Sequence, residues 1–171
     1  MDPGLLILRL VVGLTLAAHG AQKLFGWFGG YGLAGTGGFL EQLGFRAGKR
    51  AAFMAGAAEA VGGLLLALGA AVPLAATLIV GVMLVAIVTV HWTKGFFNQN
   101  GGFEYLIVLA VAALSVVVTG PGRISVDAWL GREYVGIAWG LVSLIVGSAG
   151  AAVQLASRHR EPTVHPATKA A

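Results

Sequence analysis

Long apolar stretches, separated by short polar segments, make up most of this chain. They lie near residues 4–22, 51–71, 73–92, 103–119 and 134–156. A run of about 18 or more residues with few or no charges is typical of a transmembrane helix, since about 20 helical residues cross the hydrocarbon core. The stretch 103–119 is short for that length. The pattern predicts an all-α fold, an integral membrane helical bundle with five spanning helices.

The composition supports a membrane protein. Of its 171 residues 57% are hydrophobic and 11% are charged, whereas a soluble domain carries about 25% charged residues. Only loops and a short tail remain outside the apolar stretches, which excludes a separate soluble domain and predicts the lipid bilayer as a partner. The chain has no cysteine, and this excludes thiol–disulfide exchange and thiolate metal ligands.

The first apolar stretch is expected to be a retained helix. It begins with Met1 and Asp2 and lacks a basic amino-terminal region. His19, Gln22 and Lys23 stand where a signal peptide would have small residues before its cleavage site.

The basic residues predict an orientation, because cytoplasmic loops of membrane proteins are enriched in Lys and Arg. The net charge of +4 is interpreted as a signal for membrane orientation and not for nucleic-acid binding, since the basic residues cluster at helix ends. Five spans place eight basic residues on one side and three on the other, whereas four spans give five against six. We therefore expect an outside amino terminus and a cytoplasmic carboxyl terminus. The eight are Lys23, Arg46, Lys49, Arg50, Lys94, Arg158, Arg160 and Lys169, and the three are Arg9, Arg123 and Arg132.

Several polar and ionisable residues lie inside or at the ends of the apolar stretches. A charged group at the centre of a bilayer costs roughly 2.5–3.5 kcal/mol on insertion scales, and such groups usually face the bundle interior and serve a function. These residues are the candidates for ligand binding or proton handling: Arg9, His19, Gln22, Lys23, Glu59, His91, Asn98 and Glu104.

Their depths predict a polar cleft open to the cytoplasm. With a rise of 1.5 Å per residue, His19 lies roughly 7 Å, Glu59 roughly 14 Å and Arg9 roughly 21 Å below the cytoplasmic surface. The cleft would narrow toward Glu59 and Arg9. Side chains tilt toward their own helix amino terminus, which favours pairing of Glu59 with His19 or Lys23. Pairing with Arg9 stays open if the second helix begins later.

Some of these residues also have a structural interpretation, and four of them could form a metal site. Lys23, His91 and Glu104 lie near the interfaces, where long side chains extend to water without a further role. His19 and His91 together with the two glutamates could also bind a metal. Their spacing matches no local ligand motif, so no metal site is predicted.

The chain resembles the DoxX family. The resemblance rests on the run His19–Gly30 with Gly32-Leu33 and Gly35-Thr36, and on later matches. These are Ala58-Glu59 with Gly62-Gly63, His91 with Gly95-Phe96-Phe97, Gly101-Gly102 before Glu104-Tyr105, and Gly120-Pro121-Gly122-Arg123 with Ser125 and Asp127.

The resemblance spans about residues 5–128 and implies a small protein of the bacterial inner membrane, built as a four-helix bundle. The expected organisation is a DoxX-like four-helix domain over 1–131, an additional transmembrane helix over 132–157 and a basic flexible cytoplasmic tail over 158–171. The added helix is a departure from the family pattern.

The family is named after a subunit of an archaeal quinone-linked oxidase, so the first functional hypothesis is a membrane subunit of a redox complex whose cleft binds a quinone. His19, Glu59 and His91 would exchange protons with it. The chain has no cysteine, flavin motif or haem pair. Electrons would therefore come from a soluble or membrane redox partner, no covalent cofactor is expected, and the chain is not a complete oxidoreductase alone.

Two alternatives stay open from the sequence. One is a carrier or binding protein for a small amphiphile or anion, suited to the basic residues at the cleft entrance. The other is a scaffold whose fifth helix and basic tail recruit soluble partners. Homo-oligomerisation is compatible with all three hypotheses.

Overall fold

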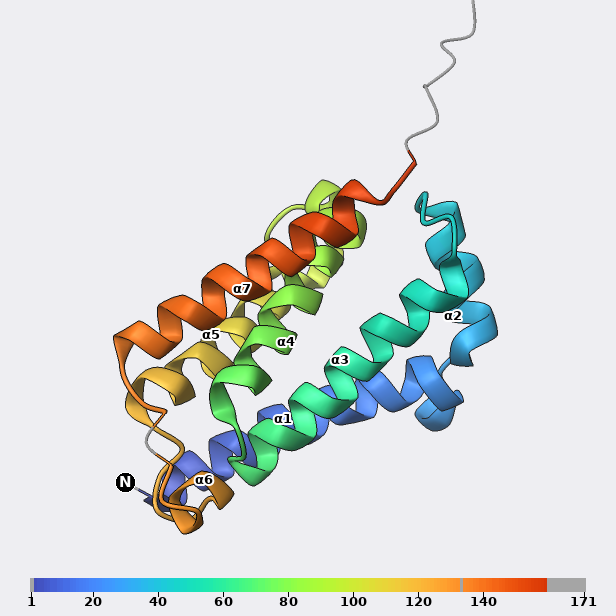
Figure 1. The fold of residues 1–171 in the computed structure, drawn as a ribbon. Helices are drawn as coiled ribbons and strands as arrows, with labels where there is room; N and C mark the ends of the chain where they lie inside the picture. The colour runs from blue at the N-terminus through green and yellow to red at the C-terminus, as the bar shows by residue number, and fades with distance from the viewer. Residues whose placement is uncertain (1, 133, 160–171) are drawn as a thin grey trace, which may run out of the picture.

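The computed structural model describes residues 2–132 and 134–159, and this part of the chain is helical apart from turns and one isolated bridge between Phe45 and Arg158. The prediction of an all-α membrane bundle is confirmed. Figure 1 shows the α-helices, which are α1 (Asp2–Phe25), α2 (Gly32–Gln42), α3 (Gly48–Leu68), α4 (Val72–Ala86), α5 (Glu104–Thr119), α6 (Val126–Trp129) and α7 (Ile137–Ala156).

Four of the described helices are long and apolar enough to cross a membrane: α1, α3, α7, and α4 together with its continuation to Lys94. The continuation is a π-helical turn, Ile87–His91, followed by a 3₁₀ turn, Trp92–Lys94. Helix α5 is apolar but has 16 residues, so it is about 24 Å long. It is shorter than the hydrocarbon core of about 30 Å.

The bundle has two distinct ends. The α2 end carries α2, the 92–103 segment and the carboxyl end of α7. The α6 end carries the amino terminus of α1 and residues 120–132 and 134–136 (Figure 1). Helix α4 packs against α3, α5 and α7, while α1 packs against α3. Helices α3 and α4 are joined by a short turn at the α6 end and diverge toward the α2 end (Figure 1).

Helices α1 and α3 touch through glycines. A Cβ atom on Gly13 would lie 2.5 Å from the carbonyl oxygen of Gly63, and one on Gly20 would lie 2.5 Å from the amide nitrogen of Ala60. Lipid supplies no hydrophobic force between helices, so small residues that permit close van der Waals packing dominate such contacts. This close approach brings the polar residues of α1 against α3.

Helix α2 begins at Gly32. The α2 end differs from the expected pattern at one point. Arg158 and His159, expected in a flexible tail, contact the turn after α2. The Arg158 Nε donates to the Leu43 carbonyl at 2.8 Å, and the His159 amide donates to the Gly44 carbonyl at 2.8 Å. Residues 160–171 of the predicted tail lie outside the described residues.

A buried carboxylate organises the α6 end. Asp127 is 1% exposed and accepts hydrogen bonds from the backbone amides of Ala71 at 2.9 Å and Val72 at 3.1 Å. These amides open α4, where the helix dipole favours a negative charge. The Asp127 amide in turn donates to the Gly69 carbonyl at 2.9 Å. Asp127 thus holds the segment around α6 against the turn between α3 and α4.

Asp127→Asn is expected to lower the free energy of unfolding by about 1–3 kcal/mol, because an amide has one acceptor oxygen for two buried amides and the other amide loses its partner. Thermal unfolding in detergent micelles would measure the loss. Asp2→Asn is the control, since Asp2 accepts one bond, from the Arg123 amide at 3.0 Å, at an exposed position. Equal effects of the two substitutions would contradict this role of Asp127.

Candidate functional site

An ion pair links α1 to α3 inside the bundle. The Lys23 Nζ lies 2.5 Å from the Glu59 Oε2, and the two side chains are 29% and 5% exposed. Gly56 permits this contact, because a Cβ there would lie 3.1 Å from the Lys23 Cβ. The sequence favoured His19 or Lys23 as the partner of Glu59, and in the structure the partner is Lys23. The pair satisfies a carboxylate that would be costly to bury alone.

His19 is oriented by Gln22 in the next turn of α1. The His19 Nδ1 lies 3.0 Å from the Gln22 Oε1, and the Gln22 Nε2 donates to the Phe28 carbonyl at 3.2 Å. Because the amide nitrogen faces a carbonyl, the amide oxygen faces the histidine, so Nδ1 carries the hydrogen. In a neutral imidazole the other ring nitrogen, Nε2, is then an acceptor.

His91 is oriented in the same way, from the continuation of α4. It ends the π-helical turn that continues α4, a feature often found at functional sites. Its Nδ1 lies 2.6 Å from the Gly101 carbonyl oxygen. A carbonyl can only accept, so Nδ1 donates and Nε2 is again left as the acceptor.

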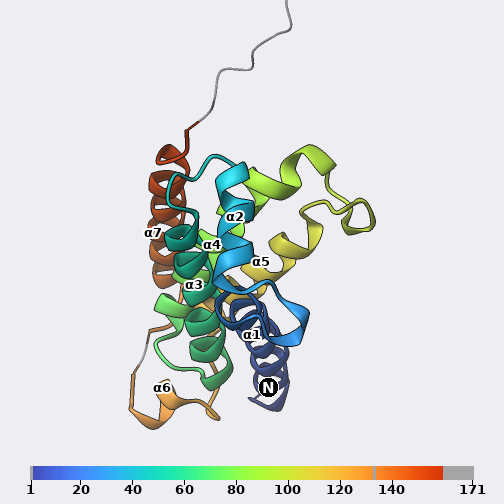
Figure 2. The same ribbon diagram turned by 90° about the vertical axis from the view of Figure 1, so that its right-hand side faces the viewer.

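The 92–103 segment that supplies Gly101 is internally bonded. The Phe103 amide donates to the Gly95 carbonyl at 3.2 Å, and the Trp92 and Phe103 rings stack at a centroid distance of 5.5 Å. The Glu104 Oε2 accepts from the Asn98 amide at 3.0 Å. Figure 2 shows the segment projecting to one side of the bundle beyond α5. These contacts fix the position of the carbonyl that orients His91.

These groups surround one cavity of about 330 Å³ between α1, α2, α3, α4 and α5. Its polar lining consists of His19, Lys23, Glu59, Thr89, His91, Asn98 and Tyr105, and the rest is apolar. Of the candidates named from sequence, Gln22 and Glu104 do not line it but bond to residues that do. The structure thus brings seven of the eight candidates to the cavity or next to it.

Arg9 is the exception. It is 1% exposed, lies at the α6 end and donates from Nη2 to the Ile124 carbonyl at 2.5 Å. The cavity therefore does not extend to Arg9. This differs from the cleft predicted from residue depths, which narrowed toward both Glu59 and Arg9. The physical reason is that the segment after α5 folds back over the α6 end and supplies a carbonyl partner for the guanidinium.

Two residues of the cavity were missed from the sequence. Tyr105 was not among the candidates, yet it lines the cavity. Thr89 lies within the π-helical turn, and its hydroxyl donates to the Val85 carbonyl at 2.8 Å. Its position two residues before His91 was the available signal. Within residues 2–132 and 134–159, no group of three or more His, Cys, Asp or Glu side chains could hold a metal ion.

Comparisons with known proteins add a family and one relative. The DoxX family model matches residues 4–92, which is more than half of the chain and covers α1 through the π-helical turn. A Bacillus subtilis (strain 168) protein named "Putative oxidoreductase CatD" is 28% identical over 127 residues, which are 74% of this chain and 87% of that protein. No solved structure matches the chain.

Proposed function

The chain belongs to the DoxX family of membrane proteins, and on this premise we propose that it is a membrane subunit of a quinone-linked redox complex. The cavity at the α2 end is the proposed site of the quinone headgroup. When bound, a quinone supplies coupled electron and proton transfer. The name of the Bacillus subtilis relative, which describes an oxidoreductase, agrees with redox chemistry.

The observation that carries this proposal is the pair of histidines on one cavity. Both have Nδ1 occupied by an oxygen acceptor. In the described part of the chain no protein atom hydrogen-bonds to the Nε2 of His19 or of His91. Two imidazole acceptors on one cavity suit the two hydroxyl protons of a reduced quinone, and each imidazole can return a proton as a general acid.

The same cavity supplies donors for the carbonyl oxygens of an oxidised quinone. The Lys23 ammonium has three hydrogens, and the contact with Glu59 uses one of them. The Tyr105 hydroxyl and the Asn98 side chain also line the cavity. The residues therefore fit both redox states of the headgroup.

We propose further that the α2 end faces the cytoplasm of a bacterial inner membrane and that a redox partner docks there to supply electrons. Among the described residues, six Lys and Arg residues lie at the α2 end and three at the α6 end, and the positive-inside rule assigns the richer end to the cytoplasm. The six are Lys23, Arg46, Lys49, Arg50, Lys94 and Arg158.

His91→Asn tests the proposed headgroup site. The asparagine amide can keep the hydrogen bond to the Gly101 carbonyl but has no equivalent of Nε2. In protein reconstituted in nanodiscs, we expect the reduced form of a short-tailed quinone to bind about three- to tenfold more weakly, as the loss of one hydrogen bond predicts. The oxidised form should be affected less, because its carbonyl oxygens need donors.

His159→Asn is the matched control, since His159 is exposed at the α2 end and its side chain is outside the cavity. The quinone titration is followed by isothermal calorimetry for both redox forms. Absence of quinone binding to the wild-type protein, or the same loss in the control variant, would refute the proposed function.

A further inference from the structure

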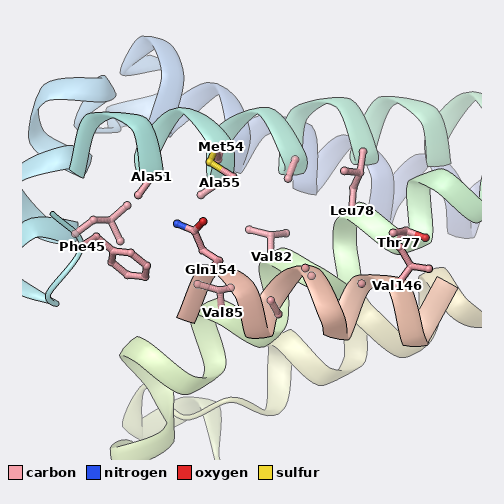
Figure 3. Close-up of a pocket in the computed structure, with 16 residues that line it drawn as sticks. Phe45, Ala51, Met54, Ala55, Thr77, Leu78, Val82, Val85, Val146 and Gln154 are labelled. Carbon is pink, nitrogen blue, oxygen red and sulfur yellow. The ribbon is translucent and has the colours of Figure 1, made fainter. Parts of the chain in front are cut away.

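A second cavity lies on the opposite side of the opening between α3 and α4. It is a groove of about 320 Å³ lined by residues of α2, α3, α4 and α7. Its lining is apolar except for Thr77 and Gln154. The Thr77 hydroxyl is already bonded to the Pro73 carbonyl at 2.8 Å. Figure 3 shows Gln154 extending from α7 into the groove toward Ala55 and Met54 of α3.

Helix α7 forms one wall of this groove. It packs against α4 and α5, while α3 diverges from α4 toward the α2 end (Figure 1), so a space is left between α3 and α7 with α4 as its floor. Small residues widen the space on the α7 side. A Cβ on Gly150 would meet nothing within 4 Å.

The groove and the histidine cavity share four lining residues, Leu40, Ala55, Val82 and Val85. The two spaces are therefore separated by no more than the thickness of these side chains, at the level where α3 and α4 have diverged. The histidine cavity carries ionisable side chains in an otherwise apolar lining, whereas the polar side chains of the groove are the uncharged Thr77 and Gln154. This division matches a single amphiphile with a compact polar head and an apolar tail.

We propose that the groove between α3, α4 and α7 binds the apolar tail of the quinone whose head occupies the histidine cavity. The substrate class is thus a long-tailed, isoprenoid-type quinone rather than a tailless one. This inference rests on the proposed function, and it assigns a role to α7, which lies beyond the residues that match the family model.

The charge of the head cavity favours a neutral amphiphile over a phospholipid. The Lys23 ammonium is paired with the Glu59 carboxylate, so the pair presents no net charge to a phosphate. The other polar side chains that line the cavity, among them Asn98 and Tyr105, hydrogen-bond to uncharged oxygens equally well. An uncharged quinone head meets these groups without an unpaired charge.

Tail binding within a membrane gains little from transfer out of water, because the tail is already in lipid. The gain comes from close packing against the groove walls, so the effect on affinity is modest and the position of the tail is the sharper readout. The experiment therefore uses a quinone with a photoreactive diazirine in its first isoprenoid unit, bound to the full-length protein in nanodiscs. Mass spectrometry identifies the labelled residues.

The expected result is labelling of groove residues on α3, α4 and α7 near the shared wall, including Met54 and Gln154. Gly150→Phe fills the groove without a clash at Cβ and should reduce this labelling at least fivefold. It should leave the affinity for a short-tailed quinone unchanged. Ala152→Phe adds the same ring at an exposed position of α7 outside the groove and should change neither.

Three outcomes would overturn the inference in distinguishable ways. If the probe labels residues outside the groove, or if Gly150→Phe leaves the labelling unchanged, the tail site is refuted. The head site is still supported in that case, provided that the short-tailed quinone binds. Equal labelling by a phospholipid with the same diazirine in its acyl chain assigns the groove to lipid. Failure of both long- and short-tailed quinones to bind refutes the proposed function and this inference with it.

Discussion

Lys23→Met is expected to destabilise the folded protein by about 3–5 kcal/mol, because it leaves the buried Glu59 carboxylate without its partner. Glu59 is 5% exposed, and its Oε2 lies 2.5 Å from the Lys23 Nζ. Replacing both residues with apolar side chains of similar size, Lys23→Met with Glu59→Leu, should restore most of the loss, since no unpaired charge then remains. The double variant is thus expected to be more stable than Lys23→Met alone.

Thermal unfolding in detergent micelles would measure all of these variants. Lys49→Met is the matched control, because it removes the same charge from an exposed position in the first turn of α3. If Lys23→Met and Lys49→Met shift the unfolding midpoint equally, the ion pair does not stabilise the bundle. A double variant no more stable than the sum of the single changes would contradict coupling between the two residues.

Gly20→Leu is expected to disrupt the contact between α1 and α3 at a cost of about 3 kcal/mol or more, since overpacking a tight interface forces the backbones apart. A Cβ at this position already lies 2.5 Å from the Ala60 amide nitrogen. Separation of the helices would also pull Lys23 away from Glu59. We therefore expect a lower unfolding midpoint together with weaker quinone binding.

Gly4→Leu is the control on the same helix. Nothing lies within 4 Å of a Cβ at Gly4, and leucine favours a helix over glycine by roughly 0.5–1 kcal/mol. This variant should keep or raise the midpoint. Equal midpoints for Gly20→Leu and Gly4→Leu would show that close packing of α1 on α3 does not determine stability.

The membrane helices could be predicted because each is recognisable from its own composition. The five predicted stretches, 4–22, 51–71, 73–92, 103–119 and 134–156, coincide closely with α1, α3, α4 with its continuation, α5 and α7. The π-helical turn Ile87–His91 could not be predicted, because it depends on a local change of hydrogen-bond register and not on hydrophobic pattern. That turn carries His91 to the cavity.

The candidate site was predictable in part. Side-chain tilt correctly favoured a partner for Glu59 from the cytoplasmic half of α1, and the structure provides Lys23. The hydrogen-bond partner of Arg9 could not be predicted. Its partner, the Ile124 carbonyl, is 115 residues away in sequence, and no spacing rule within one helix connects them.

The sequence by itself determined that this chain forms membrane helices and that most of its polar intramembrane groups lie toward one end. Both properties follow from the transfer of individual side chains between water and lipid, which depends on local composition. Only the tertiary structure decided that Lys23 pairs with Glu59, that His19 and His91 share a cavity, and that an apolar groove adjoins it. These depend on which helices pack and where α3 and α4 diverge, because lipid leaves helix association to close van der Waals contact rather than to hydrophobicity.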